Sequence, residues 1–266
     1  MQKRCLGQSG IEVSVIGLGT VKFGRNQGVK YPTAFQLPSE SELEHLIDQA
    51  YDLGINLLDT APAYGMSEER MGKLLQGKRH DWIISTKVGE EFIDGVSQFN
   101  FSEQAILHSV ERSLQRLQTD YLDILLVHSN GDDVYLIEEE EVFKTLAVLK
   151  KSGKIRAYGM STKTLAGGLL AVEYADVVMV IFNPVQQTER EVIVQAAHRQ
   201  KGVLVKKALA SGHLQHLNSN HPVTDSLRFI LAEPGVSSII VGTINVEHLR
   251  ECAVISRTTT IHQCHF

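Results

Sequence analysis

The sequence predicts an α/β protein, a single (β/α)8 barrel of the TIM type with a short hairpin at its N-terminus. Two observations support this fold class: eight short apolar runs alternate with amphipathic segments, and no linker or change of composition divides the chain. A barrel of this kind is typically about 250 residues long, which fits 266 residues. We therefore expect one domain over residues 1–266, with an open, doubly wound sheet as the alternative.

The strands and loops follow in a regular order. Residues 4–14 carry glycines between short apolar pieces, which is typical of a small hairpin. Long loops are expected at residues 21–38 and 88–101. Mostly apolar runs indicate barrel strands that are covered on both faces, at residues 15–19, 56–59, 82–88, 122–128, 155–161, 177–183, 203–209 and 238–243.

Capping residues mark the helices between these strands. Helix starts are expected at Ser41, Ser102 and Thr188, of which the first and last have a glutamate three residues later, as in a capping box. The glutamates at residues 138–141 are also expected to begin a helix, because carboxylates are favoured at a helix N-terminus. Four glycines follow helical patterns and precede strands, where a left-handed residue ends a helix: Gly54, Gly77, Gly153 and Gly202.

The glycine pair at residues 17–20 is weak support for a dinucleotide-binding open sheet. It leads into the expected loop at residues 21–38, whereas the dinucleotide fingerprint requires a helix N-terminus that meets the pyrophosphate. This difference favours the closed barrel.

Composition and charge exclude several other classes. Hydrophobic residues make up 43% of the chain and charged residues 21%, so a folded core is expected. The net charge is −5 and no basic stripe occurs, which argues against nucleic acid as a partner. Neither a membrane-spanning apolar run nor a secretory signal is recognisable, and the three cysteines are widely spaced. We expect a cytoplasmic protein without a membrane partner, either a monomer or a small homo-oligomer.

Polar residues stand at the ends of three consecutive predicted strands. Asp59 and Tyr64 follow the second strand, Lys87 ends the third and His128 ends the fourth. Each residue alone has an ordinary structural explanation, such as a salt bridge or a turn cap. Because the carboxyl ends of parallel strands share one rim, we expect the four side chains to lie together at a catalytic site.

These four groups compose a proton-donating centre. A free phenol has a pKa of about 10, and a nearby ammonium and imidazole favour its ionised form. Asp59 is expected to hold Lys87 charged, so that Tyr64 acts as the general acid toward a carbonyl oxygen. His128 is expected to orient the carbonyl and donate to the developing alkoxide. A second reading stays open, in which Lys87 forms a Schiff base with a carbonyl substrate.

The remaining histidines do not indicate a metal site. His213, His216 and His221 are loosely spaced in a polar segment that reads as a loop, so no metal ligand is expected. The tail at residues 258–266 lacks helical periodicity and is expected to be a flexible end.

The sequence resembles the aldo-keto reductases over its whole length. The pattern RxLGxSGxxVSxIGLGT at residues 4–20 is similar to their N-terminal segment, and LDTAxxYG at residues 58–65 is similar to their catalytic turn. The resemblance implies a (β/α)8 barrel and an oxidoreductase that reduces an aldehyde or ketone by hydride transfer from NADPH. It also implies the catalytic tetrad Asp59, Tyr64, Lys87 and His128, with Tyr64 as the acid. Because some members of the family are ancillary proteins of membrane channels, a nucleotide-binding regulatory subunit with little turnover is an alternative.

The resemblance further implies a cofactor site after the first and the last four strands. NADP(H) is the expected cofactor and NAD(H) stays open, because positions 242 and 248 lack the Lys or Arg of many NADPH-specific members. Lys207 lies where many members stack an aromatic ring on the nicotinamide, and its aliphatic stem is expected to cover that ring. The expected cofactor-binding residues are Gly19, Thr20, Ser161, Thr162, Met179, Lys207, Leu209, Ser211, Gly212, Gly242, Thr243, Asn245, His248, Glu251 and Cys252.

Overall fold

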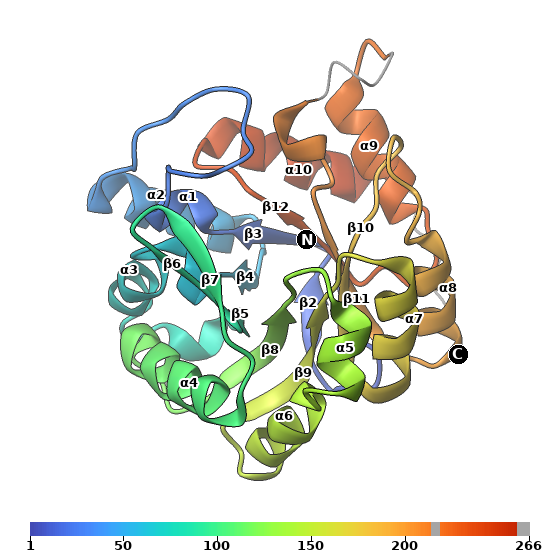
Figure 1. Cartoon of the computed structure of the whole chain (residues 1–266). Helices are drawn as coiled ribbons and strands as arrows, with labels where there is room; N and C mark the ends of the chain where they lie inside the picture. Colours follow the sequence, from blue (N-terminus) through green and yellow to red (C-terminus); the bar gives the residue numbers. More distant parts are fainter. Residues whose placement is uncertain (214–218, 260–266) are drawn as a thin grey trace.

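The computed structural model describes residues 1–213 and 219–259, in which eight strands close into a barrel in the order β10-β11-β12-β3-β4-β5-β8-β9 (Figure 1). Neighbouring strands pair in parallel, including β12 with β3, which closes the sheet. This closure confirms the (β/α)8 barrel and excludes the open sheet. The strands are β3 Ile16–Gly19, β4 Leu57–Asp59, β5 Ile83–Val88, β8 Leu122–His128, β9 Ile155–Ser161, β10 Val177–Ile181, β11 Gly202–Lys206 and β12 Ser238–Val241.

Helices surround the barrel on the outside (Figure 1). None of those within the described ranges is long and apolar enough to cross a membrane. The α-helices are α1 Val21–Gly24, α2 Glu40–Asp52, α3 Ser67–Leu74, α4 Glu103–Leu117, α5 Asp133–Glu138, α6 Val142–Lys151, α7 Leu165–Tyr174, α8 Arg190–His198, α9 Pro222–Leu231 and α10 Val246–Thr258. Short 3-10 turns are η1 Pro62–Tyr64, η2 Arg79–Asp81 and η3 Ala210–Gly212.

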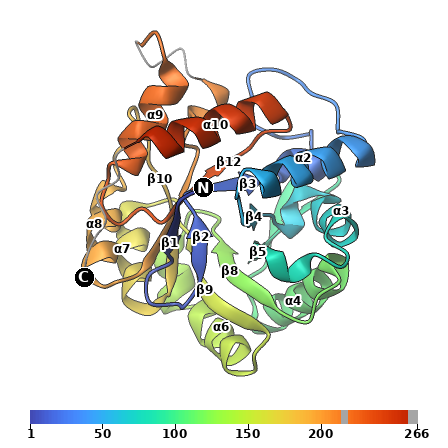
Figure 2. The same ribbon diagram turned by 180° about the vertical axis from the view of Figure 1, so that it is seen from behind.

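The N-terminal hairpin covers the end of the barrel at which the strands begin. Its strands β1 (Lys3–Cys5) and β2 (Glu12–Ser14) pair antiparallel and cross this end of the barrel when the molecule is seen from behind (Figure 2). Leu6, Ile11 and Val13 are buried against inward-facing strand residues such as Leu57 and Ile124. A second, larger apolar cluster lies between the strands and the helices. The bottom of the barrel is therefore sealed, and the opposite end remains for a site.

Several helix ends differ from the predictions. Helix α2 begins two residues earlier than expected, because Ser39 and Glu42 form the capping box rather than Ser41 and Glu44. Helix α8 has no side-chain cap, so Thr188 does not have the predicted role. Ser102 caps α4 as predicted, with its hydroxyl accepting from Ala105 N.

The predicted helix-ending glycines are correct at three of the four positions. Gly54, Gly77 and Gly153 have positive φ angles, whereas the left-handed residue before β11 is Gln200. Gly202 is required for a different reason, since a Cβ there would lie 2.5 Å from Leu6 Cγ. The acidic run at residues 138–141 joins two helices: α5 ends at Glu138 and α6 begins after Glu141.

Both long loops contain regular structure that the sequence did not reveal. The segment at residues 21–38 begins with the short helix α1, and the segment at 88–101 forms the antiparallel hairpin of β6 (Glu90–Ile93) and β7 (Val96–Phe99). The predicted tail starts later than expected, because α10 continues to Thr258. Residues 260–266 and His216 lie outside the described residues.

Candidate active site

A cavity of about 920 Å³ opens where the barrel strands end, and it brings the four predicted catalytic residues together. Asp59 ends β4, Lys87 lies one residue before the end of β5 and His128 ends β8, so neighbouring strands present them at one rim. Tyr64 ends the turn η1 that follows β4. The volume is near the upper limit for small-molecule sites and suits an extended ligand.

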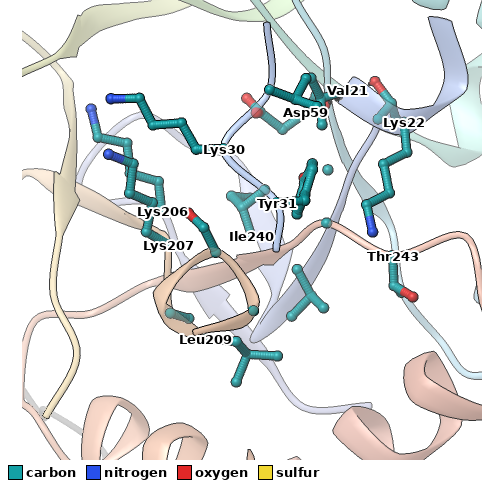
Figure 3. A pocket seen from close by; sticks show the side chains of 18 of the residues that line it. Val21, Lys22, Lys30, Tyr31, Asp59, Lys206, Lys207, Leu209, Ile240 and Thr243 are labelled. Carbon is teal, nitrogen blue, oxygen red and sulfur yellow. Dashed lines mark hydrogen bonds between the residues drawn. The ribbon is translucent and has the colours of Figure 1, made fainter. Parts of the chain in front are cut away.

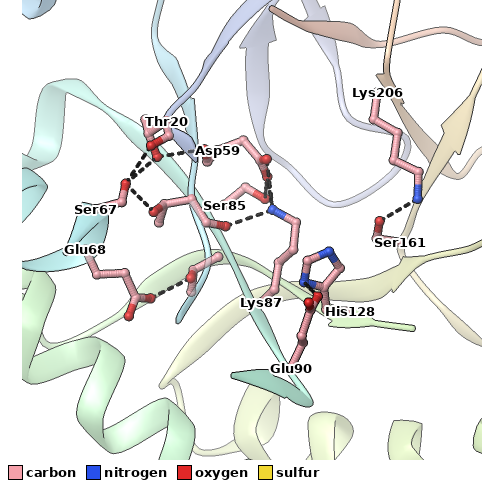
Figure 4. Close-up of polar contacts among 12 residues, drawn as sticks. Thr20, Asp59, Ser67, Glu68, Ser85, Lys87, Glu90, His128, Ser161 and Lys206 are labelled. Atoms are coloured by element: carbon pink, nitrogen blue, oxygen red, sulfur yellow. Dashed lines mark hydrogen bonds and ion pairs between the residues drawn. The ribbon is translucent and has the colours of Figure 1, made fainter. Parts of the chain in front are cut away.

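Asp59 and Lys87 form a buried ion pair at the cavity (Figure 4). Lys87 Nζ donates to both carboxylate oxygens of Asp59 and to the carbonyl oxygen of Thr60, each at 2.8 Å. Ser85 donates a further hydrogen bond of 2.8 Å to Asp59. Burial lowers the pKa of Lys87, but the charges and hydrogen bonds of Asp59 and Tyr64 together outweigh it, and the pKa is raised overall. Lys87 therefore stays charged, as predicted.

A chain of buried hydroxyls holds the turn beside this pair (Figure 4). Thr60 donates to Ser67 at 3.0 Å, Ser67 donates to Thr20 Oγ1 at 2.8 Å, and Thr20 donates to the Asp59 carbonyl at 3.0 Å. Gly65 makes the turn with a φ of 61°, and a Cβ there would lie 2.2 Å from the Gly24 carbonyl oxygen. Close backbone contact between Gly65 and Gly24 therefore fixes the position from which the Tyr64 side chain extends into the cavity.

The Tyr64 ring lies between Lys87 and His128. Lys87 Nζ is 5.0 Å from the ring centroid, and the Tyr64 and His128 rings meet edge to face at 6.2 Å. Burial raises the pKa of Tyr64 and outweighs the charge of Lys87, which lowers it. The predicted lowering of this pKa is therefore wrong in its overall direction, although the contribution of Lys87 has the expected sign. The phenol keeps its proton and is able to donate it.

The sequence did not reveal a carboxylate beside His128. Glu90 begins the hairpin β6–β7, and its Oε2 lies 2.8 Å from His128 Nδ1 (Figure 4). Ser97 from the other hairpin strand donates a 2.6 Å hydrogen bond to Glu90 Oε1. Although burial raises the pKa of Glu90, His128 and Ser97 lower it overall to about 2, so this carboxylate is ionised. Burial lowers the pKa of His128, and Glu90 opposes this shift.

The sequence also gave no indication of Lys206, a second lysine that lines the cavity. Lys206 Nζ donates to Ser161 Oγ at 2.8 Å and to the Thr162 carbonyl at 2.7 Å (Figure 4). Burial lowers its pKa to about 8, and the nearby Glu189 carboxylate opposes this shift. Lys207, the predicted position, also lines the cavity, but its ammonium forms no such bond to Ser161. The adjacent lysines in the sequence gave no signal for which of them faces Ser161.

Most of the expected cofactor residues line the same cavity, from Gly19 and Thr20 through Ser161 and Met179 to Cys252. The exceptions are Thr162, whose buried hydroxyl donates to Glu189 at 2.8 Å, and Asn245, whose side chain caps α10. The other lining residues from that set are Lys207, Leu209, Ser211, Gly212, Gly242, Thr243, His248 and Glu251.

The loop at residues 21–38 forms a further wall of this cavity. Lys22 Nζ lies 4.1 Å from the Tyr31 ring centroid, and burial raises the pKa of Tyr31 to about 12. Tyr31 packs so closely on the residue after β12 that a Cβ on Gly242 would lie 2.9 Å from its hydroxyl. Figure 3 shows Tyr31 in the middle of the pocket, with Lys22 pointing toward Thr243. The loop thereby places a cation near a segment that has none at positions 242 and 248.

No group of three or more His, Cys, Asp or Glu side chains that could hold a metal occurs within residues 1–213 and 219–259. Cys252 is buried, and burial raises the pKa of its thiol to about 12, which keeps it protonated. His221 precedes α9 as its cap residue.

Comparison with known proteins agrees with this geometry. The crystal structure of PA4992 from Pseudomonas aeruginosa superposes with a TM-score of 0.88 and 48% sequence identity, over 97% of this chain and 95% of that chain. The oxidoreductase YqkF of Bacillus subtilis is 29% identical over 94% of this chain and 90% of its own length. The aldo-keto reductase YhdN of the same organism is 39% identical over 60% of this chain, which is 47% of that protein. The sequence profile of the Aldo/keto reductase family matches residues 15–225, and the chain belongs to this family of oxidoreductases.

Proposed function

We propose that this protein reduces an aldehyde or a ketone with NADPH and that Tyr64 supplies the proton. The observation that carries the proposal is the position of Tyr64 above the Lys87–Asp59 ion pair and beside His128, at one end of a cavity suited to an extended ligand. The proton donor, a fixed positive charge and an imidazole thus lie within one pocket.

The residues of the cavity fit a nicotinamide dinucleotide. Gly19 and Gly242 keep it open: a Cβ on Gly19 would lie 2.9 Å from Ile240 Cγ2, and a Cβ on Gly242 would meet Tyr31. Helix α10 begins at the cavity, where the positive end of its dipole favours a phosphate. Ser161, held by Lys206, would bind the carboxamide, and Gly242 and Thr243 would lie along the phosphates. When bound, such a cofactor supplies the hydride that reduces the carbonyl carbon.

The position of Lys22 is the reason to propose NADPH rather than NADH as the cofactor. Its ammonium points toward Thr243 (Figure 3) and forms no ion pair with any residue in the described part of the chain. A 2′-phosphate prefers cationic donors, and Lys22 would supply the charge that positions 242 and 248 lack. NAD(H) is the alternative cofactor.

The proton step follows from the electrostatics of Tyr64. Burial raises the pKa of the phenol, so the group carries the proton before the reaction. As the carbonyl oxygen gains negative charge, the Tyr64 O–H bond breaks and a new O–H bond forms on that oxygen. The phenolate that remains is stabilised by the ammonium of Lys87, which Asp59 keeps charged. Lys87 forms no bond to the substrate in this step.

The Glu90 carboxylate determines how His128 can help. A proton on His128 Nδ1 faces Glu90 Oε2 at 2.8 Å, so neutral His128 presents the lone pair of Nε2 to the cavity. The protonated imidazole carries hydrogen on both nitrogens and donates to the carbonyl oxygen through Nε2. The charge of Glu90 favours this protonated form. In this proposal the donor role of His128 belongs to the imidazolium, which Glu90 favours but which burial disfavours, because the pKa of His128 is lowered overall.

The two alternative functions have less support. A Schiff base requires a neutral amine, whereas three hydrogen bonds and a raised pKa keep Lys87 as an ammonium. A regulatory subunit without turnover would not need a buried ion pair and a second carboxylate around the same phenol.

Turnover by a Tyr64→Phe variant tests the proposal. The oxidation of NADPH and of NADH is followed by absorbance with a panel of aromatic and aliphatic aldehydes. Because the variant lacks only the phenolic hydroxyl that donates the proton, the kcat of Y64F is expected to fall by about 10²- to 10⁴-fold while NADPH binding, measured by its fluorescence, is retained. The exposed Tyr135→Phe serves as the matched control. Full activity of Y64F, or no oxidation of either cofactor by the wild-type protein, would overturn the proposal.

A further inference from the structure

Three lysines from three different loops line the mouth of the cavity. Lys30 lies in the loop at residues 21–38, Lys163 follows β9, and Lys207 follows β11. All three side chains are exposed, so their ammonium groups are free to move toward a ligand. Figure 3 shows Lys30, Lys206 and Lys207 on the same side of Tyr31.

These lysines repel one another. Partial burial and then the positive charges of Lys30 and Lys163 lower the pKa of Lys207, and the Glu189 carboxylate opposes this shift. None of the three is in an ion pair with a residue of the described ranges, 1–213 and 219–259. Like charges that converge without a counter-charge destabilise a protein, and an anion relieves this cost when it binds between them.

The carboxylates nearest to the three lysines are already engaged. Glu189 accepts hydrogen bonds from Thr162 Oγ1 and Ile181 N, both at 2.8 Å. Asp133 accepts from the backbone N–H of Lys163 at 2.9 Å and from Thr164. Both acids therefore hold the segments around Lys163 by hydrogen bonds from neutral donors, and within the described residues neither forms an ion pair with the three lysines.

The backbone of Lys207 is held in an uncommon conformation. Its φ is 54°, in the left-handed region that residues other than glycine rarely adopt. The side-chain amide of Asn183 donates to the Lys207 carbonyl at 3.0 Å and fixes this geometry. Such local strain is often kept where it directs a functional side chain.

The three lysines lie on the side of the cavity that holds the catalytic histidine. Lys163 Nζ is 5.6 Å from the ring centroid of Phe99, which lies on the hairpin that contributes Glu90 to His128. Lys22 points toward Thr243 on the other side of Tyr31 (Figure 3). One set of cations thus borders the reacting end of the cavity and the other borders the expected phosphate segment.

We propose that Lys30, Lys163 and Lys207 bind an anionic group of the carbonyl substrate, a carboxylate or a phosphate. The substrate class is then a negatively charged aldehyde or ketone, with the anion at the mouth of the cavity and the carbonyl next to Tyr64. This inference rests on the proposed reductase function. The same lysines would also suit a phosphate of the cofactor, so the experiment separates these two sources.

The test compares pairs of substrates that differ in charge. Reduction of 4-carboxybenzaldehyde is measured against 4-methylbenzaldehyde, and D-glyceraldehyde 3-phosphate against D-glyceraldehyde, for the wild-type protein and the double variant K30Q/K163Q. Lys207 is kept because its stem is expected to touch the cofactor. The double variant K144Q/K151Q removes the same charge from the exposed face of α6 and controls for the net charge of the protein.

The wild-type protein is expected to prefer at least one anionic substrate through a lower KM. This preference should weaken as NaCl is added, because salt screens exposed charges. In K30Q/K163Q the kcat/KM for that anion should fall by at least about tenfold, because two charged donors to the anion are removed. The neutral substrates and the Kd for NADPH should change little, and K144Q/K151Q should resemble the wild type.

Three results would overturn the inference. The first is a wild-type protein that reduces the neutral aldehydes but gains nothing from either anion. The second is a loss in K144Q/K151Q as large as in K30Q/K163Q. The third is a higher Kd for NADPH in K30Q/K163Q, with equal losses on charged and neutral substrates, which would assign the lysines to the cofactor. Failure of the proposed function is distinct, because then no aldehyde of either charge is reduced.

Discussion

Glu90 Oε2 lies 2.8 Å from His128 Nδ1, so a carboxylate from a hairpin outside the barrel faces the imidazole at its rim. Although burial opposes ionisation, contacts with His128 and Ser97 hold the pKa of Glu90 at about 2, and this residue is negatively charged throughout the physiological range. Its charge opposes the effect of burial on the pKa of His128. The hairpin thus influences the pKa of a barrel residue.

Replacing Glu90 with Gln is expected to move the alkaline limit of activity to lower pH. Glu90 raises the pKa of His128, so the uncharged amide lets burial lower that pKa further. If the imidazolium is the active form, log kcat should begin to decline at a lower pH in E90Q than in the wild type. The measurement is a pH profile of kcat for wild type and E90Q at saturating NADPH.

Two further variants control this profile. Ser97→Ala removes a hydrogen bond to Glu90 but leaves its charge, and should shift the profile less. In a His128→Asn background the E90Q change should have little effect on the profile. An E90Q profile that coincides with that of the wild type would show that His128 does not sense this charge.

Replacing Lys87 with Met is expected to destabilise the protein and remove its activity. Asp59 would then remain buried without its partner, and breaking a buried pair in this way costs about 3–5 kcal/mol. In K87M/D59N no buried charge is left, so much of the lost free energy of unfolding should return while activity stays absent. Urea unfolding of the wild type, K87M and K87M/D59N measures both changes. Equal stability of the two variants would contradict the importance of the unpaired carboxylate.

Lys206 is expected to make stability depend on pH in the alkaline range. Burial lowers its pKa from 10.5 to about 8, so the folded state binds fewer protons than the unfolded state between these values. The free energy of unfolding should therefore rise from about pH 8 to pH 10.5, relative to a variant without this amine. Below pH 8 the cost of the buried charge is constant. Above pH 10.5 it is absent.

Urea unfolding of Lys206→Met at several pH values between 7 and 10 tests this linkage. The wild type should gain stability relative to K206M as the pH rises. The matched control is Lys151→Met, an exposed lysine at the end of α6, for which the difference should not change with pH. A constant difference between the wild type and K206M would mean that the pKa of Lys206 is not lowered in the fold.

Contact between Tyr31 and Gly242 predicts how the loop at residues 21–38 responds to mutation. An added Cβ in Gly242→Ala would lie 2.9 Å from the Tyr31 hydroxyl and push the loop outward. Trypsin should then cleave after Lys30 several-fold faster than in the wild type, because proteases cut exposed and opened segments. Adding Tyr31→Phe removes the clashing oxygen and should slow cleavage again. Unchanged cleavage in G242A would show that the loop does not rest on β12 in solution.

The barrel and the residues at its rim were both predictable from the amino-acid sequence. Each of the eight predicted strands is present, because a strand covered on both faces reads as a continuous apolar run. Asp59, Lys87 and His128 lie at or next to the carboxyl ends of three neighbouring strands, and this position brings them to one cavity. The last three strands, β10, β11 and β12, end earlier than predicted. The apolar residues that follow each of them lie in loops.

The surroundings of these residues depend on tertiary contacts. Glu90 and Lys206 depend on contacts between segments 38 and 45 residues apart along the chain, to His128 and Ser161, and no local pattern encodes such contacts. The pKa of Tyr64 likewise depends on burial by the whole cavity wall, which outweighs the neighbouring Lys87. Sequence periodicity reports which face of an element is covered, whereas charge, distance and desolvation belong to the assembled barrel.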